Sequence, residues 1–290
     1  MLSSVQVAPA GPAAQARPRQ PRYKSSITIY DVATKSTKVL YTADTVWEAP
    51  NWSIDGKFLL ANSGGKIYKL AVNGTGQVTP EKLDIDATLS CNNDHGPSWN
   101  GKMLAFSASS PEVRQSRVYI ADADGKNARL MTTKAPSYFH GWSPDDKWIT
   151  VIADRGGSNY DIFRIPAAGG EEQRLTTSTG YDDGSEYSPD GAGPNDSKAQ
   201  RVTSDEQEDW FPHVSPNGKK IVFLSFPPGT KDHNGKTDIQ LRMMDAPGAT
   251  IKPAKIETVT KFFGGQGTIN VNSWSPDSKK FAYVVYEALP

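Results

Sequence analysis

The sequence predicts an all-β fold, a β-propeller with six blade positions, because a turn motif recurs, its copies are regularly spaced, and both ends carry incomplete strand sets. The motif is a Trp followed by Ser-Pro-Asp-Gly-Lys or a close variant, and then by an apolar run. Self-similarity with a period of about 40–45 residues is typical of propellers. The anchor residues of the six copies are Trp52, Trp99, Trp142, Tyr187, Val214 and Trp274.

Within one repeat, the local sequence predicts four short strands. Ser-Pro-Asp-Gly is a tight-turn sequence, because Pro presets φ, Asp bonds back to the backbone and Gly accepts a positive φ. An apolar run such as Ile221–Leu224 follows the turn and suits a buried strand. A third segment such as Arg117–Asp122 and a short fourth such as Arg174–Thr176 complete the unit. Four short strands per repeat describe a propeller blade.

The fourth repeat is too short to hold four strands. Tyr187 and Val214 are only 27 residues apart, whereas the preceding anchors are 43 to 47 residues apart. We therefore expect blade four to be truncated to about two strands, with Gln200–Thr203 as its fourth strand. Because such a deletion would expose the neighbouring apolar faces, we expect either inward collapse of the remnant or self-association on this side. Of the two, self-association is favoured.

The two ends of the chain predict one shared blade. Ser26–Val32 and Thr37–Thr42 look like third and fourth strands, and Asn270–Glu287 supplies a first and a second strand. A ring closed by both termini leaves no open sheet edge. Residues 1–22 are rich in Ala and Pro and are expected to form a disordered leader, so that residues 23–290 form a single domain. This leader has no apolar core, and no signal peptide is visible in it.

Composition excludes several classes of function. Lys and Arg number 32, as do Asp and Glu, and this neutrality argues against nucleic acid or an anionic membrane as partner. The single cysteine, Cys91, excludes an internal disulfide and a cysteine-based zinc site, and we expect its thiol to be buried and inert. No apolar stretch is long enough to span a bilayer. The absence of Gly-x-Ser-x-Gly excludes a propeller-plus-hydrolase peptidase.

The candidate ligand site lies in the central channel, which the first strand of each blade lines. The five residues before each anchor include three of the four histidines, together with carboxylates, amides and aromatic rings. Such a concentration is typical of a ligand pocket. The alternative is that these polar groups only satisfy the inner strands and hold water. The predicted ligand-binding residues are Glu48, His95, His140, Asp183, Glu186, Trp210, His213 and Asn270.

Two kinds of chemistry are open at these residues. His95, His140 and His213 come from different blades and could converge on a divalent metal in the channel, although no local spacing motif supports one. His140, Glu186 and His213 are candidates for general acid–base catalysis. No complete catalytic constellation is present, so the sequence favours a protein that is not an enzyme, and it identifies no cofactor.

The Trp-Ser-Pro-Asp-Gly-Lys turns and the Arg-Leu-Thr strand ends at Arg174 and Arg201 make residues 26–288 resemble the TolB-like propellers, whose repeats are called PD40 or WD40-like. The resemblance implies a six-bladed propeller, a periplasmic or other extracytoplasmic location, and a binding or interaction module. The partner is then a protein, or a small polar ligand or oligosaccharide in the channel.

Since the family includes sugar-active members, a carbohydrate lyase or hydrolase using the channel histidines and carboxylates is the alternative. A third interpretation is that the chain is purely a protein-docking scaffold that uses loops such as Pro227–Lys236. The chain departs from the family pattern at blade four.

Overall fold

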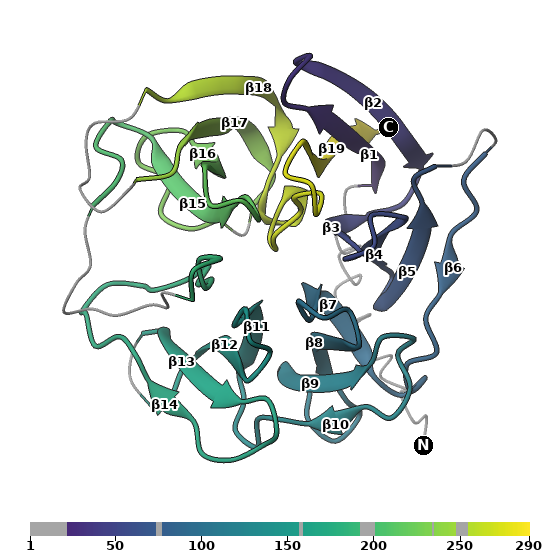
Figure 1. The fold of residues 1–290 in the computed structure, drawn as a ribbon, viewed down its shortest axis with the longest axis vertical. Helices are drawn as coiled ribbons and strands as arrows, with labels where there is room; N and C mark the ends of the chain where they lie inside the picture. The colour runs from purple at the N-terminus through teal and green to yellow at the C-terminus, as the bar shows by residue number, and fades with distance from the viewer. Residues whose placement is uncertain (1–21, 74–76, 157–158, 192–200, 234, 248–254) are drawn as a thin grey trace, which may run out of the picture.

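The structure is a computed structural model, which describes residues 22–73, 77–156, 159–191, 201–233, 235–247 and 255–290. The predicted leader therefore lies outside the described residues, except for Arg22. The described residues form an all-β propeller, as the repeat predicts, with five sheets arranged around a central axis (Figure 1). Four sheets have four strands, and the closing sheet has three.

The four-stranded sheets follow the predicted order, from an inner first strand to an outer fourth strand. In the first sheet these strands are β3 (Glu48–Trp52), β4 (Phe58–Ser63), β5 (Lys66–Ala71) and β6 (Glu81–Lys82). In the second they are β7 (Ser90–Pro97), β8 (Met103–Ser109), β9 (Arg117–Asp122) and β10 (Arg129–Leu130). In the third they are β11 (Ser137–Trp142), β12 (Trp148–Ala153), β13 (Asp161–Pro166) and β14 (Gln173–Arg174). In the fourth they are β15 (Glu208–Val214), β16 (Lys220–Phe226), β17 (Thr237–Asp245) and β18 (Glu257–Gly264).

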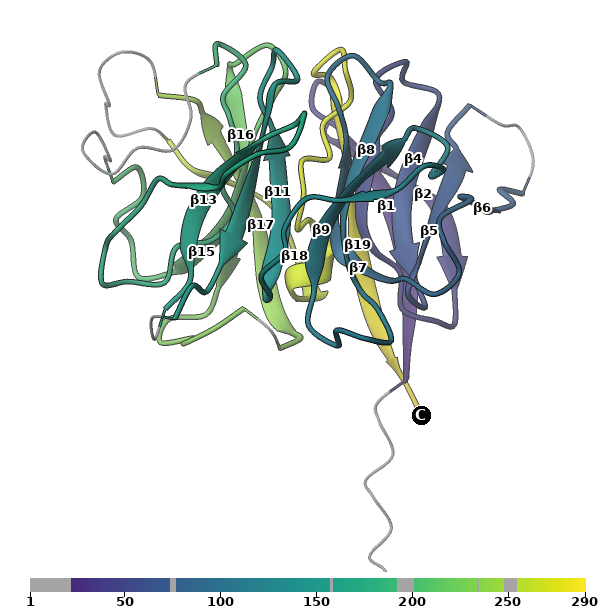
Figure 2. The ribbon, with the colours of Figure 1, turned by 90° about the horizontal axis from the view of Figure 1, so that it is seen from below.

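Both termini close the ring, as predicted. β19 (Lys280–Leu289) pairs antiparallel with β1 (Arg22–Asp31) along the full length of both strands, and β2 (Ser36–Ala43) adds the outer edge. Figure 2 shows β1 and β19 running side by side to the same end of the molecule. The expected first strand of this blade is irregular. A 3₁₀ helix, η2 (Gln266–Thr268), and a single bridge between Trp274 and Phe281 take its place.

The prediction of six blades with a truncated fourth is wrong, because the structure has five. Among the described residues between β14 and β15, none belongs to a strand, and this includes Arg201–Thr203; Gln200 lies outside the described residues. Two strands by themselves are only marginally stable in water. A truncated blade without its middle strands would therefore not keep its remaining strands paired. The described part of this segment that follows β14 instead runs inward towards the centre of the ring (Figure 1). It is held there by the Thr150 hydroxyl, which donates to the carbonyl of Ser185 at 3.0 Å.

The recurring turns have the geometry that their residues predict. In the first copy, the Ser53 hydroxyl donates to Asp55 at 2.7 Å and accepts from the backbone amide of Phe58 at 3.1 Å. Gly56 has a φ of 70°, which places the next residue back in the strand direction. The same arrangement joins Ser143 to Asp145 and Ser275 to Asp277. These turns fix one end of every inner strand, and with it one rim of the channel.

A candidate binding channel

The inner strands share an irregularity that decides which side chains reach the channel. β3, β7, β11 and β15 each shift register against their partner strand a few residues before or at the turn motif. At two of these bulges, a residue other than glycine takes a left-handed conformation, with φ of 52° at Ala49 and 55° at Phe211. A bulge bends the strand and re-aims its side chains, and bulges are over-represented beside functional sites.

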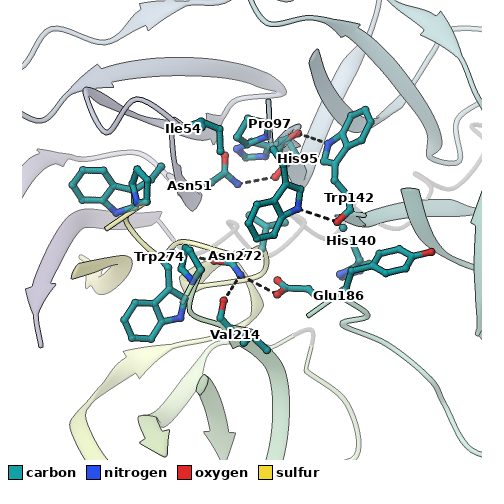
Figure 3. A pocket seen from close by; sticks show the side chains of 18 of the residues that line it. Asn51, Ile54, His95, Pro97, His140, Trp142, Glu186, Val214, Asn272 and Trp274 are labelled. Atoms are coloured by element: carbon teal, nitrogen blue, oxygen red, sulfur yellow. Dashed lines mark hydrogen bonds between the residues drawn. The ribbon is translucent and has the colours of Figure 1, made fainter. Parts of the chain in front are cut away.

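One cavity, of about 120 Å³, opens at the end of the channel that carries the recurring turns (Figure 3). We call it the mouth pocket. Its rim is mainly aromatic and aliphatic, because each motif contributes its anchor residue and the residues of the turn. The rim residues are Trp52, Ile54, Pro97, Trp99, Trp142, Tyr187, Val214, Pro216, Trp274 and Pro276. Its floor contains three of the predicted ligand-binding residues, His95, His140 and Glu186.

Hydrogen bonds between neighbouring blades hold this rim in place. The indole Nε1 of Trp142 donates to the carbonyl of Gly96 at 3.0 Å, and that of Trp274 donates to the carbonyl of His213 at 3.0 Å. The Asn51 amide donates to the carbonyl of His95 at 2.7 Å, as Figure 3 shows. Trp142 and Trp274 therefore clamp neighbouring blades together, as well as lining the pocket.

His95 is a completely buried histidine, and neither of its ring nitrogens has a hydrogen-bond partner. Burial lowers the pKa of His95 to about 4, a shift that the backbone of Leu60 opposes only in part. The ring is therefore neutral at physiological pH. Three further buried atoms of residues that line the pocket, Oδ1 of Asn51, Nε1 of Trp52 and the hydroxyl of Tyr187, also have no partner.

A second cavity, of about 410 Å³, occupies the other end of the channel, near the start of the inner strands. We call it the inner chamber. Its lining is polar and aromatic, and His140 lies in the wall between it and the mouth pocket. The lining residues are Asn92, Asn93, Asp94, Tyr138, His140, Ile152, Tyr160, Tyr181, Asp183, His233 and Gln266.

Asp183 connects three distant parts of the chain at this chamber. One of its oxygens lies 3.0 Å from Nε2 of His140 on β11, and the other lies 2.9 Å from Nε2 of His233 on the loop between β16 and β17. Burial opposes ionisation of Asp183, but the two histidines outweigh it and hold the pKa of this carboxyl well below its usual range. Burial likewise opposes protonation of His140, yet Asp183, Asp94 and Glu186 together raise its pKa. The Asp183 carboxylate therefore favours the protonated form of His140, and a protonated His140 favours the ionised form of Asp183.

Glu186 and His213 form a second buried pair. Oε1 of Glu186 lies 2.5 Å from Nδ1 of His213, and its Oε2 accepts from the Asn272 amide at 3.0 Å. The other ring nitrogen of His213 lies 2.5 Å from the carbonyl oxygen of Ile269. Because both nitrogens of His213 are engaged by protein atoms, this histidine has no free position for a substrate proton.

The remaining predicted residues lie beside the two cavities and do not line them. Trp210 packs on His233, with ring centroids 4.6 Å apart. The Asn270 amide donates to Asp94. Glu48 lies 3.9 Å from Lys236, and burial raises the pKa of its carboxyl.

Sequence reasoning missed His233, Tyr160 and Tyr181, because none of them precedes an anchor residue. The sequence did contain one indication of His233: it is the one histidine that does not precede an anchor residue, and it lies in the long polar insertion Pro227–Lys236.

Within the described residues, no three His, Cys, Asp or Glu side chains come together as a group that could hold a metal ion. His95, His140 and His213 therefore do not form a ligand set in this structure.

Cys91 is buried, and burial raises the pKa of its thiol to about 12, which makes it a poor nucleophile. No helix of the described chain has the length and apolar character needed to cross a membrane.

Comparison with known proteins finds two matches that extend over most of the chain, although no family model matches it. An uncharacterised protein of Agrobacterium fabrum strain C58 is 40% identical over 280 residues, which cover 91% of this chain and 92% of that protein. The solved structure of a TolB candidate from Agrobacterium tumefaciens aligns with a TM-score of 0.85 and 39% identity, over 92% of this chain and 99% of that one.

A shorter match reaches TolB of the Tol-Pal system from Francisella tularensis. It is 32% identical over 95 residues, which span 31% of this chain and only 22% of that protein. The extended matches and the propeller architecture agree with each other. The chain belongs to the TolB-like family of β-propellers.

Proposed function

We propose that this chain is a non-catalytic binding module whose ligand site is the central channel, and that the mouth pocket receives a segment of a partner protein. The observation that carries this proposal is the combination of an aromatic, apolar rim with buried polar atoms that have no partner in its walls. Ligand pockets are typically apolar cavities with a few placed polar groups. An apolar side chain of the partner would pack between the tryptophans, while its backbone would meet the polar groups.

Family resemblance supports a protein partner and an extracytoplasmic location. The Francisella relative is named as a component of the Tol-Pal system. That assignment concerns a protein of which this chain matches about a fifth, so both the partner and the periplasmic location of this chain are proposals. Self-association on the side between β14 and β15 likewise stays a prediction.

A carbohydrate lyase or hydrolase is the rival function. Two of the candidate catalytic residues are paired with each other, since Glu186 holds His213, and the third, His140, is held by Asp183. General acid–base catalysis needs a group within hydrogen-bond reach of the substrate proton. The engagement of both nitrogens of His213 by protein atoms favours binding over turnover. Turnover of an oligosaccharide panel that disappears in the His140→Ala variant would instead establish the enzyme.

The mouth pocket can be tested with a matched pair of surface substitutions. Peptides would be selected from a random phage-displayed library on the purified chain, and their affinity would then be measured by tryptophan fluorescence. Ile54 lies on the rim and is 41% exposed, whereas Val39 lies on the outer strand β2 and is 57% exposed. Ile54→Asp should weaken peptide binding at least about tenfold, because it places a charge in an apolar contact.

Val39→Asp should leave peptide binding unchanged. Selected peptides that bind the wild type and the Ile54→Asp variant equally would exclude the mouth pocket as their site. A library that yields no binding peptide would contradict the proposed protein partner.

A further inference from the structure

The inner chamber contains a buried carboxylate, Asp94, that forms no ion pair with any described residue. Burial raises the pKa of this carboxyl, and the nearby His140 opposes that shift only in part. Asp94 on β7 is 1% exposed, and its oxygens accept hydrogen bonds from the side-chain amides of Asn92 and Asn270. Among the described residues, no Lys, Arg or His lies within ion-pair distance of Asp94, whereas Asp183 is paired with two histidines. No Lys or Arg lines the chamber. Buried charges are normally paired or neutralised, so this carboxylate calls for an explanation.

Three tyrosines form an aromatic wall in the same chamber. The ring centroids of Tyr138 and Tyr160 are 6.1 Å apart, and those of Tyr160 and Tyr181 are 5.2 Å apart. Burial raises the pKa of Tyr138 and of Tyr181, so that both hydroxyls stay protonated and neutral. Aromatic faces attract organic cations, and the attraction grows when the site is shielded from water.

Together these features select one class of ligand. The two oxygens of Asp183 are engaged by two histidines, whereas the oxygens of Asp94 accept only from side-chain amides, which leaves Asp94 as the group that a ligand cation can pair with. A neutral sugar would not require a carboxylate without a counter-ion, and the described side chains offer no set of metal ligands. We propose that the inner chamber binds a small organic ammonium ion, with Asp94 as its counter-ion and the three tyrosines as its wall.

The chamber of about 410 Å³ has room for such a ligand. This site is separate from the mouth pocket, because the side chain of His140 lies between the two cavities. Failure of either proposal therefore leaves the other standing.

The first experiment compares a cation with its neutral isostere. Isothermal titration calorimetry would measure the binding of choline and of 3,3-dimethylbutan-1-ol, and a second series would use methylammonium and putrescine. At least one ammonium ion should bind with a Kd below 10 mM, and the neutral alcohol should bind at least about tenfold more weakly than choline. Failure of every ammonium ion to bind, or equal affinity for choline and the alcohol, would overturn the proposal.

The second experiment removes the counter-ion. Asp94→Asn keeps the size of the side chain and should weaken ammonium binding at least about tenfold. Asp124→Asn, at an exposed hairpin, is the matched control and should change nothing. Thermal unfolding without ligand would show that both variants are folded. Undiminished ammonium binding by the folded Asp94→Asn variant would overturn the proposal.

The third experiment separates the aromatic wall from the hydroxyl groups. Tyr181 is 46% exposed, so its replacement should not disturb the core. Tyr181→Phe keeps the ring and should retain binding, whereas Tyr181→Leu should weaken it several-fold. Equal binding by the Phe and Leu variants would contradict the aromatic wall and overturn the proposal in its present form.

Discussion

Nε2 of His233 lies 2.9 Å from an oxygen of Asp183, and this contact anchors an inserted loop in the channel. His233 belongs to the polar insertion between β16 and β17, and its side chain is only 3% exposed. Trp210 and Phe211 pack against its ring. The insertion is therefore part of the channel wall at this point, although Pro227 and Lys231 on the same loop are exposed.

The contact between His233 and Asp183 predicts the effect of replacing His233. His233→Ala should lower the free energy of unfolding by about 1–3 kcal/mol, because the buried Asp183 oxygen loses its partner. Urea denaturation would measure this loss, and hydrogen exchange should show faster exchange in the amides of residues 229–233. Lys231→Ala changes an exposed residue of the same loop and should do neither. Similar exchange rates in the His233 variant and the wild type would show that the loop is held by other contacts.

The buried, unpaired ring of His95 predicts an acid-sensitive stability. Its folded pKa of about 4 lies below the unfolded value of 6.5, so the unfolded state binds more protons between these two pH values. The stability that the neutral ring contributes is therefore complete above pH 6.5 and is lost as the pH falls towards 4. Between pH 7 and 4.5, the wild type should lose about 2–3 kcal/mol more than a His95→Leu variant. Parallel pH profiles of unfolding free energy would show that His95 is not the acid-sensitive group.

The clamp between neighbouring inner strands predicts a cost for a mild substitution. Trp142→Phe keeps an aromatic ring but leaves the buried Gly96 carbonyl without its indole donor. The free energy of unfolding should fall by about 1–3 kcal/mol. Trp148→Phe is the matched control, because Trp148 is half-buried on β12 and stacks with Arg164. Trp148→Phe should lower the free energy of unfolding clearly less than Trp142→Phe does. Equal losses of stability in the two variants would argue against the clamp.

The inward segment between β14 and β15 can be tested through a glycine that it covers. A Cβ at Gly141 would lie 3.3 Å from both the Glu186 Cα and the Ser185 carbonyl oxygen, so Gly141→Ala should push the segment outward. Such overpacking typically costs about 1–3 kcal/mol. Gly235→Ala has no atom within 4 Å of the new Cβ and should change stability by less than about 0.5 kcal/mol. An unaffected Gly141→Ala variant would show that the segment is not packed against β11.

Local sequence was sufficient for the turns, the strand order and the closure of the ring. The hydroxyl of Ser53 and the carboxylate of Asp55 make contacts within their own turn, so the motif that names them also determines their geometry. The strands β1 and β19 were recognisable because each end lacked what the other supplied. His95 and His140 were located because the inner strands β7 and β11 lead into their anchor residues, and Glu186 because it precedes an anchor residue in a segment that forms no strand.

The number of blades and the composition of the two cavities depended on the tertiary structure. A strand exists only with a partner, and whether a short repeat finds one is decided by its neighbours in space; here Ser185 packs against Thr150 and no strand forms. The contact between Asp183 and His233 joins residues 50 positions apart, through a loop that carries no repeat signal. Periodicity in the sequence determines which elements repeat, whereas non-repeating segments are positioned only by long-range packing. These segments add Tyr181, Asp183 and His233 to a chamber whose other walls come mainly from β7, β11 and β12.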